Sequence, residues 1–453
     1  MIPAHALVER ALAAATVEQT FVIVTDSSEA SLRWAGNSMT TNGVAARRRW
    51  TVVSIAGNSA GAAVASVSST SVDPADIASV VASAETAARR AQPAEDAMPP
   101  VQNSSSSEPW DADPERTAID VFRPLTDGLS AGFDGTDQLY GFAHHQVETV
   151  WLGSSTGIRT RFTQPTGSVE INGKKGEASA WVGAGTKRFD DVAVDGLLDE
   201  LATRLGWAST RVDLPAGRYE TLLPPSAVAD LMIYLMWSME GRGAQEGHTA
   251  FSRAGGTRIG EKLGSVPLTL FSDPVAPGLE YSPFLATGSS NDAVSVFDNG
   301  LPTGRVEWIR EGVVNALAYP RFAAERYDAH PTVPGENLIL DGGGSVDIAD
   351  MVARTERGLL LTTLWYIREV DPSTLLLTGL TRDGVYLVED GQVTGAVNNF
   401  RFNESPLDLL RRVTEAGETS PTLPREWKDW FTRTAMPPLR IPDFHMSSVS
   451  AAQ

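Results

Sequence analysis

Apolar and polar positions along the chain repeat with two periods, and the period changes from one segment to the next. Residues 4–15 place alanine and leucine at helical spacing, and a second helix is predicted from Asp73 to Arg90. Between these helices, runs of β-branched and aromatic residues separated by Asn and Gly predict strands, so residues 1–91 are expected to form an α+β domain. The predicted strands are Phe21–Thr25, Ala30–Trp34, Arg49–Ile55 and Ala62–Val67.

A polar stretch separates this domain from the rest of the chain. Residues 92–116 are rich in proline, serine and acidic side chains and contain almost nothing to bury, which predicts a linker. After it, residues 117–133 are weakly helical, and the pattern then alternates as it does in strands. Val194–Leu205 places leucines on one helical face. We therefore expect residues 117–220 to form a middle β-rich region that carries the helix of residues 194–205.

The most apolar helix is predicted in a C-terminal β-rich domain, residues 221–453. It spans residues 226–240, with Ser226 as its expected N-cap and Gly241 just after its end. Apolar residues occupy nearly every face, which is typical of a helix at the centre of a domain. The fold class is therefore α+β with a large antiparallel component. The strands predicted after this helix are Leu268–Phe271, Val294–Asp298, Arg305–Glu311, Leu359–Arg368, Thr374–Thr378, Gly384–Glu389 and Thr394–Phe402.

Composition narrows the classes of function. A net charge of −19 argues against a nucleic-acid-binding surface, because binding to phosphates requires clusters of Lys and Arg. The absence of cysteine excludes disulfides, thiolate metal sites and cysteine nucleophiles. No apolar run approaches the ~20 residues that span a bilayer, and His5, Glu9 and Arg10 interrupt any secretory signal. A soluble cytoplasmic protein is expected, with no nucleic-acid and no membrane partner.

One serine motif has the sequence pattern of a nucleophile elbow, the turn that presents a catalytic serine. Gly153–Gly157 has the pattern G-x-S-x-G, which requires a strand before the serine and a helix after it. The residues from Ile158 onward alternate like a second strand instead, so a hairpin turn is the favoured interpretation. A hydrolase that uses Ser154 or Ser155 is the third-ranked hypothesis for function.

A glycine-rich segment, Gly255–Lys262, superficially resembles a phosphate-binding P-loop. The P-loop needs Gly-Lys-Ser/Thr, so that the lysine reaches phosphate and the hydroxyl holds Mg²⁺. Here Glu261 follows Gly260, and Leu263 follows Lys262, which removes both functions. A connecting loop that contacts a peptide or a partner is the better interpretation.

The histidines do not form the pairs that a zinc-binding helix requires. Such a helix holds two histidines four or five positions apart with an adjacent glutamate, so that both ligands share a face. His144 and His145 are consecutive and would point to opposite faces of a strand. Structural or surface roles are therefore expected for all six, which are His5, His144, His145, His248, His330 and His445.

Four long blocks of sequence share their order and spacing with a known family. They are Ser27–Gly43, Leu139–Arg159, Arg218–Met232 and Arg357–Val397. Together they resemble the TldD/PmbA family, specifically its PmbA (TldE-type) branch. The resemblance implies a two-domain fold, with a smaller N-terminal α/β unit and a large, curved, mostly antiparallel sheet domain around buried helices.

The resemblance also implies where a metal site would lie. In the catalytic branch of the family an H-E-x-x-x-H helix holds a metal, with a cysteine as a further ligand. Matching Glu240 and Gly241 to the Glu-Gly that follows this motif puts the histidine positions on Met232 and Trp237, and the glutamate position on Ile233. A thioether and an indole do not replace two imidazoles, and isoleucine is not a base. No catalytic or metal-binding residue and no cofactor is expected in this chain.

The implied function is that of a non-catalytic subunit. Family members of this kind pair with a metal-bearing TldD-type paralogue in a heterodimeric metallopeptidase that degrades unfolded or leader-like peptides, with zinc in the partner subunit. The chain would complete the chamber and help to hold an extended peptide by strand addition. The alternative is a stand-alone peptide-binding or scaffold protein, such as a homodimer. The residues expected to contact peptide or partner are Arg258, Gly260, Glu261, Trp365, Tyr366 and Arg368.

Overall fold

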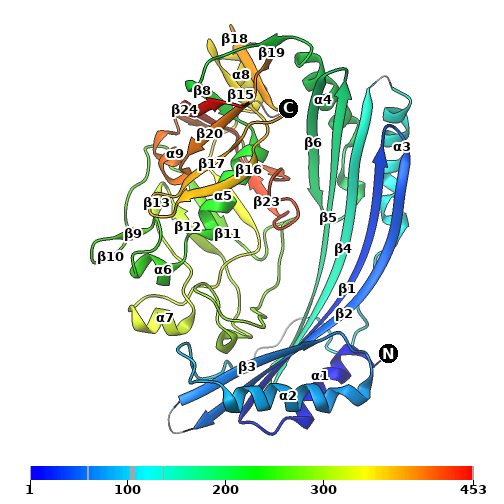
Figure 1. The fold of residues 1–453 in the computed structure, drawn as a ribbon, viewed down its shortest axis with the longest axis vertical. Coiled ribbons are helices and arrows are strands. Elements are labelled where there is room, and N and C mark those ends of the chain that lie inside the picture. The colour runs from blue at the N-terminus through cyan, green and yellow to red at the C-terminus, as the bar shows by residue number, and fades with distance from the viewer. Residues whose placement is uncertain (1, 59–60, 103–107, 136, 451–453) are drawn as a thin grey trace.

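The computed structural model describes residues 2–58, 61–102, 108–135 and 137–450. Its N-terminal half is organised around a six-stranded antiparallel sheet in the order β3-β2-β1-β4-β5-β6. Figure 1 shows this long sheet as a curved wall beside the C-terminal half. Its strands are β1 (Gln19–Ala35), β2 (Met39–Asn58), β3 (Gly61–Ser69), β4 (Gln138–Ser154), β5 (Arg159–Lys175) and β6 (Ala178–Thr186).

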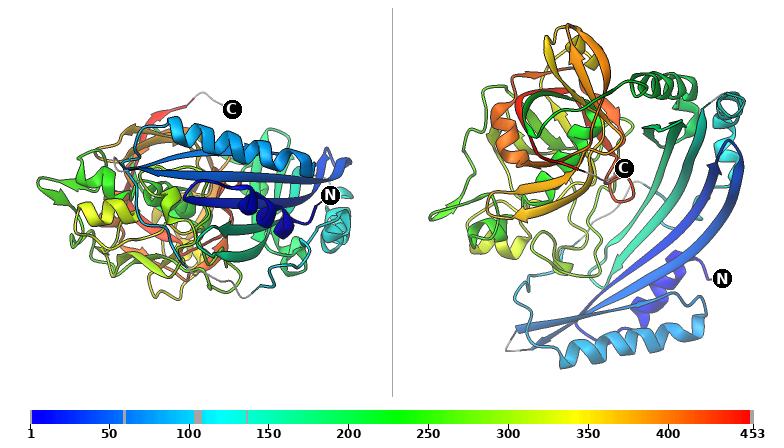
Figure 2. Two further views of the ribbon diagram at one scale, coloured as in Figure 1. Left: turned by 90° about the horizontal axis from the view of Figure 1, so that it is seen from below. Right: turned by 45° about the horizontal axis from the view of Figure 1, so that its top comes forward.

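Alternation of side chains along β1 determines what each face of the long sheet covers. Val22 and Val24 point to one face and pack with helices α1 (Ala4–Ala14) and α2 (Ile77–Arg90), which lies along β2 and β3 (Figure 2). Farther along the same face, Leu32 and its neighbours pack under two more helices. These are α3 (Arg123–Phe133) and α4 (Val194–Trp207).

The opposite face of the long sheet contacts the C-terminal half. Phe21 and Ile23 of β1 are buried in one cluster with Phe284 and Phe297. Short 3-10 helices also occur in both halves of the chain. They are η1 (Pro74–Asp76), η2 (Ile119–Phe122), η3 (Phe189–Asp191) and η4 (Val296–Asp298).

The sheet crosses the boundary expected between residues 1–91 and 117–220. β1 and β4 pair from Phe21↔Ser154 to Ala35↔Tyr140, which puts both regions in one sheet. The described part of the 92–116 segment runs over this sheet, where the Trp110 carbonyl accepts a hydrogen bond of 3.1 Å from the Trp151 indole. Polar composition identifies such a segment in sequence but does not show which strands pair across it.

The C-terminal half contains a ten-stranded sheet in which β16 and β7 are the outer strands. A second, six-stranded sheet packs with it around one large core. The strands of the ten-stranded sheet are β7 (Arg211–Val212), β8 (Gly217–Leu223), β15 (Arg357–Leu361), β16 (Trp365–Asp371), β17 (Leu376–Leu380), β18 (Val385–Glu389), β19 (Gln392–Val397), β20 (Phe400–Glu404), β21 (Glu415–Ala416) and β24 (Leu439–Val449). Those of the second sheet are β11 (Thr269–Ser272), β12 (Val306–Arg310), β13 (Val313–Val314), β14 (Leu338–Asp341), β22 (Ser420–Thr422) and β23 (Thr434–Met436).

At the centre of this half lies helix α5 (Pro225–Trp237), and 9 of its 13 residues are buried. The helix ends three residues before the predicted end at 240, and Pro224, rather than Ser226, is its N-cap. Gly241 then begins α6 (Gly241–Gln245), and a Cβ at this position would lie 2.2 Å from the Tyr319 ring. The close approach of that ring requires glycine at this position. The remaining elements are β9 (Ser252–Arg253), β10 (Gly256–Thr257), α7 (Arg321–Arg326), α8 (Ile348–Ala353) and α9 (Pro406–Arg412).

Several strand predictions need correction. Residues 294–298, predicted as a strand, end in the 3-10 helix η4, because the Ser295 hydroxyl caps it by accepting from the Phe297 N–H. The predicted strand 359–368 is two strands, β15 and β16, and 394–402 is also two, β19 and β20. The predicted strands 21–25 and 30–34 are parts of the single strand β1. The α+β class with a curved, mostly antiparallel sheet is confirmed.

No helix in the described ranges has both the length and the apolar character needed to cross a bilayer.

Candidate functional site

A hollow of about 490 Å³ opens where α5 ends beside the outer strand β16. Aromatic side chains from α5 and from the segment after β22 form one wall, with Trp237 and Trp427 at a ring distance of 5.0 Å. Tyr234 packs 5.7 Å from the Trp427 ring. Ile367 and Arg368 of β16 contribute the facing wall. Trp237 remains 39% exposed, so the hollow offers an apolar surface to solvent.

A buried carboxylate fixes this aromatic wall. Asp230 of α5 is fully buried and accepts hydrogen bonds from the backbone N–H groups of Arg425, Glu426 and Trp427 at 3.2, 2.9 and 3.4 Å. Burial raises the pKa of the Asp230 carboxyl well above its usual range, and the hydrogen bonds from Glu426 and its neighbours act in the opposite direction. The indole of Trp427 also donates to the Asp230 carbonyl at 2.9 Å. Asp230 therefore holds residues 425–427 against α5.

The same segment joins α5 to the long sheet. The Arg425 guanidinium lies 4.4 Å from the Trp365 ring of β16 and 5.1 Å from the Trp181 ring of β6. It also pairs with Glu170 of β5 at 3.3 Å, and Lys428 pairs with the same carboxylate at 3.1 Å. The hollow, the edge of β16 and the long sheet are thus held together by residues 425–428.

Sequence reasoning missed Asp230, although a signal exists. It is the only charged residue among Ala227–Trp237, an otherwise apolar helix. A charge at the centre of a buried helix needs hydrogen-bond partners, because burying it unpaired is costly. The partners, however, lie 195 to 197 positions away, and no sequence pattern identifies them.

The positions that the resemblance assigns to metal ligands do not fit a metal. Met232 and Ile233 are 0% exposed and belong to the main core, and Trp237 packs on Trp427. The thioether of Met232, the alkyl chain of Ile233 and the indole of Trp237 do not offer the imidazole or carboxylate donors that zinc prefers. In the part of the chain that the structure describes, no three His, Asp or Glu side chains gather as a metal site requires.

The predicted contact residues fall into two separate places. Trp365, Tyr366 and Arg368 lie on β16, and Arg368 lines the hollow. Arg258 and Glu261 pair at 3.5 Å beyond the β9–β10 hairpin, which Figure 1 shows on the side away from the long sheet. There Glu261 also binds Arg411 of α9 at 2.8 Å. Gly260 lies in the same loop, with a φ of +86° that favours glycine.

The serine motif at Gly153–Gly157 is a hairpin turn, as predicted. β4 ends at Ser154 and β5 begins at Arg159, so a strand follows the turn where an elbow needs a helix. The Ser154 hydroxyl accepts hydrogen bonds from the N–H groups of Thr156 and Ile158 at 3.2 and 3.1 Å. These bonds stabilise the turn and give Ser154 a structural role.

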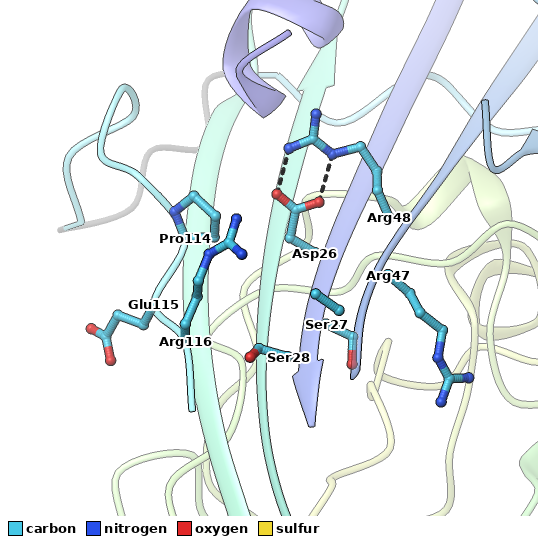
Figure 3. Close-up of a pocket in the computed structure, with 9 residues that line it drawn as sticks. Asp26, Ser27, Ser28, Arg47, Arg48, Pro114, Glu115 and Arg116 are labelled. Carbon is cyan, nitrogen blue, oxygen red and sulfur yellow. Dashed lines mark hydrogen bonds and ion pairs between the residues drawn. The ribbon is translucent and has the colours of Figure 1, made fainter. Parts of the chain in front are cut away.

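A second, smaller hollow of about 90 Å³ lies on the long sheet (Figure 3). Two of its charged groups, Arg48 and Asp26, pair with each other. The Arg48 guanidinium of β2 points at the Asp26 carboxylate of β1 and makes two hydrogen bonds to it, at 2.6 and 2.5 Å. Arg48 also donates to the Ile2 carbonyl at 2.5 Å, which ties the N-terminal residues to the sheet. This hollow is built around a structural ion pair.

Comparisons with known proteins agree with the geometry. Among solved structures, TldE from Thermococcus kodakarensis matches with a TM-score of 0.78 and 17% identity, covering 98% of this chain and 99% of that chain. A Bacteroides thetaiotaomicron protein, described as a candidate modulator of DNA gyrase, matches with a TM-score of 0.76 and 15% identity, covering 98% of each chain. A Thermotoga maritima protein with a similar description gives 0.73 and 14%, covering 94% and 95%. These likenesses establish the fold.

The sequence itself carries a family signature. The family described as the PmbA/TldA metallopeptidase C-terminal domain matches residues 216–448, just over half of the chain. No curated protein sequence matches the chain. The matched region contains α5, the hollow and all six predicted contact residues. The resemblance recognised in the sequence is confirmed, and the chain belongs to the PmbA/TldD family of metallopeptidase-like proteins.

Proposed function

We propose that this chain is the non-catalytic, TldE/PmbA-type subunit of a heterodimeric zinc-dependent metallopeptidase. Its partner would be a metal-bearing TldD-type paralogue, and the substrates would be unfolded or leader-like peptides. One observation carries the proposal: apolar side chains occupy the positions of α5 where a metal site would lie. Met232 and Ile233 are buried in the core, where the resemblance assigns a histidine and a glutamate. Catalysis then depends on zinc in the other chain.

The hollow beside β16 supports a role in holding peptide. β16 is an outer strand, so among the residues that the structure describes no strand pairs with one side of its backbone in the ten-stranded sheet. An extended peptide can hydrogen-bond to such an edge whatever its side chains, which suits unfolded substrates of many sequences. Trp237 and Tyr234 beside the edge offer apolar contacts to peptide side chains.

The test is reconstitution of activity. The full chain is mixed with a metal-bearing TldD-type paralogue, and cleavage of an unstructured fluorogenic peptide is followed. The pair is expected to exceed either subunit alone by about tenfold or more, since effects of this size follow from loss of substrate positioning. Activity that is the same when this chain is left out would contradict the subunit role.

A variant pair refines the test. Trp237→Ala removes an aromatic side chain that lines the hollow and is expected to raise KM for the peptide in the reconstituted pair. Trp430→Ala is the matched control, because Trp430 is 80% exposed and does not line the hollow. Equal effects of the two substitutions on KM would remove the hollow from the proposed peptide path. A stable homodimer with no affinity for the paralogue would favour a stand-alone peptide-binding protein.

A further inference from the structure

A carboxylate is already bound to the outer edge of β16. The backbone N–H groups of Tyr366 and Ile367 donate to the two oxygens of the Glu426 side chain, each at 3.1 Å. Arg368 adds an ion pair of 3.5 Å to the same carboxylate. The Glu426 side chain is only 9% exposed, so this carboxylate is held away from bulk solvent.

The backbone of β16 is shaped for this contact. Its pairing with β17 changes register between Trp365 and Arg368, which marks a bulge. Tyr366, in the bulge, has a φ of +51°, a left-handed conformation that is uncommon for an aromatic residue. A left-handed residue in a bulge turns consecutive N–H groups toward one point, and such a concave group of N–H donors binds anions. We call the N–H groups of Tyr366 and Ile367 the β16 nest.

The segment that supplies the carboxylate is positioned independently of the nest. The Asp230 carboxylate accepts hydrogen bonds from the backbone N–H groups of Arg425, Glu426 and Trp427. The Glu426 side chain therefore reaches the β16 nest from a fixed backbone. A side-chain torsion is enough to move the carboxylate while this backbone stays in place.

We propose that the β16 nest is a binding site for the C-terminal carboxylate of a peptide, and that Glu426 occupies the site until a peptide displaces it. The inference rests on the peptide-binding role proposed above and names the end of the peptide that is recognised. A terminal carboxylate has the same charge and the same two acceptor oxygens as the Glu426 side chain. Backbone nests are an established means of capturing peptide carboxylates.

Geometry also sets the direction of the bound peptide. From the nest, the hollow extends along Arg368 and Glu369 toward Pro372. A peptide that ends at the nest and continues into the hollow runs opposite to β16, which is antiparallel addition. At ~3.3 Å per residue, Arg368 to Asp371 accommodates about four peptide residues. The aromatic wall of the hollow then favours apolar side chains near the peptide C-terminus.

Direct binding tests the inference on the full chain. The probe is an N-terminally labelled pentapeptide of Ala, Val and Leu, made as the free acid and as the C-terminal amide, with binding measured by fluorescence anisotropy. The wild-type chain is expected to bind the acid about threefold more tightly than the amide, since charged acceptors form the stronger hydrogen bonds. Glu426→Gln weakens the internal competitor and is expected to raise affinity for the acid about tenfold, with little change for the amide.

Matched variants separate the nest from general charge effects. Glu415→Gln removes a carboxylate that pairs with Arg354 and Arg440 on another part of the sheet, and it is expected to leave both affinities unchanged. Arg368→Gln is expected to reduce the preference for the acid, because it removes the cation beside the nest. This variant and the wild-type chain give a result even if Glu426→Gln does not fold.

The outcomes distinguish this inference from the proposed function. Equal affinity for acid and amide in the wild-type chain and in Glu426→Gln overturns the carboxylate site but leaves peptide binding intact, with Glu426 serving only to protect a strand edge. Equal binding of an amidated peptide that carries an internal glutamate overturns the assignment to the C-terminus. Failure of every form to bind either peptide contradicts both the inference and the peptide-binding role.

Discussion

The two halves of the molecule use β-strands in opposite ways. In the long sheet, β1, β4 and β5 are each 17 residues long and β2 is 20, and the pairing of β1 with β4 is continuous. In the ten-stranded sheet the strands are 2 to 11 residues long, and register shifts occur in four of its strand pairs. Long, regular strands make a continuous wall, whereas short, irregular strands leave bulges where backbone donors can turn outward.

The two halves also differ in how they bury polar groups. In the long sheet, the buried pair of Arg48 and Asp26 and the buried His145 are satisfied by neighbouring strands and the segments over them. In the C-terminal half, Asp230 lies inside the central helix and is satisfied by a segment far away in sequence. The first arrangement stabilises a sheet, and the second holds residues 425–427 against α5 beside the hollow.

The largest effect is expected from Asp230→Ala. The substitution leaves three backbone N–H groups without their acceptor in a fully buried place, so the free energy of unfolding should fall by about 3–5 kcal/mol. Asp73→Ala, on the long-sheet half, removes an exposed cap that accepts from the Ala75 N–H and should cost only about 1 kcal/mol. Denaturant-induced unfolding of both variants measures the difference, and equal losses would contradict the special position of Asp230.

A smaller effect is expected from Met232→His, which restores the side chain that the resemblance assigns to this position. An imidazole at a site with 0% exposure lacks hydrogen-bond partners, so the free energy of unfolding should fall by about 3 kcal/mol. Met232→Leu keeps the volume and should cost less than about 1.5 kcal/mol. If Met232→His is as stable as Met232→Leu, then the core around Met232 of α5 is not closely packed.

The pattern of apolar positions predicts much of this fold, because it records local burial. Helix α5 and helix α4 are found within three residues of their predicted positions, and the hairpin at Gly153–Gly157 is found where alternation continues after the turn. The alternation of apolar and polar residues does not continue across Thr25–Glu29, so the pattern predicts two strands where β1 is one. Asp26 and Ser28 are largely buried here although they are polar, so burial leaves no apolar pattern in this stretch.

Long-range contacts account for what the sequence could not predict. The aromatic and basic side chains of Trp365, Tyr366 and Arg368 predict a contact surface, yet the structure shows a bulge in their backbone that no side chain announces. That bulge lies where β16 pairs with β17, and its N–H groups meet the Glu426 carboxylate, 60 positions after Tyr366. Single-sequence patterns report periodicity and turn chemistry, and neither specifies such a contact.

The smallest effect is a pH dependence in the long sheet. His145 is 5% exposed, with its ring nitrogens 2.7 Å from the Thr117 hydroxyl and 3.0 Å from the Lys187 carbonyl, and burial lowers its pKa. A lowered pKa in the folded state means that His145 contributes stability above its unfolded pKa of about 6.5, and this stability is lost as the pH falls through the folded pKa. His145→Gln does not titrate, so the variant should lose less stability than the wild-type chain between neutral and acidic pH.

Thermal unfolding between pH 8 and pH 5 measures this difference. His330→Gln is the control, because His330 is exposed, and it should follow the wild-type pH profile. If His145→Gln also follows that profile, then burial in the long sheet does not lower the pKa of the His145 imidazole.

The metal content of the purified chain tests whether α5 serves packing and leaves zinc chemistry to another chain. The purified full chain is incubated with excess zinc, desalted and analysed for bound metal by mass spectrometry. With Met232, Ile233 and Trp237 in place of ligands, the chain should retain well under one zinc ion. One tightly bound zinc ion per chain, retained through desalting, would contradict it.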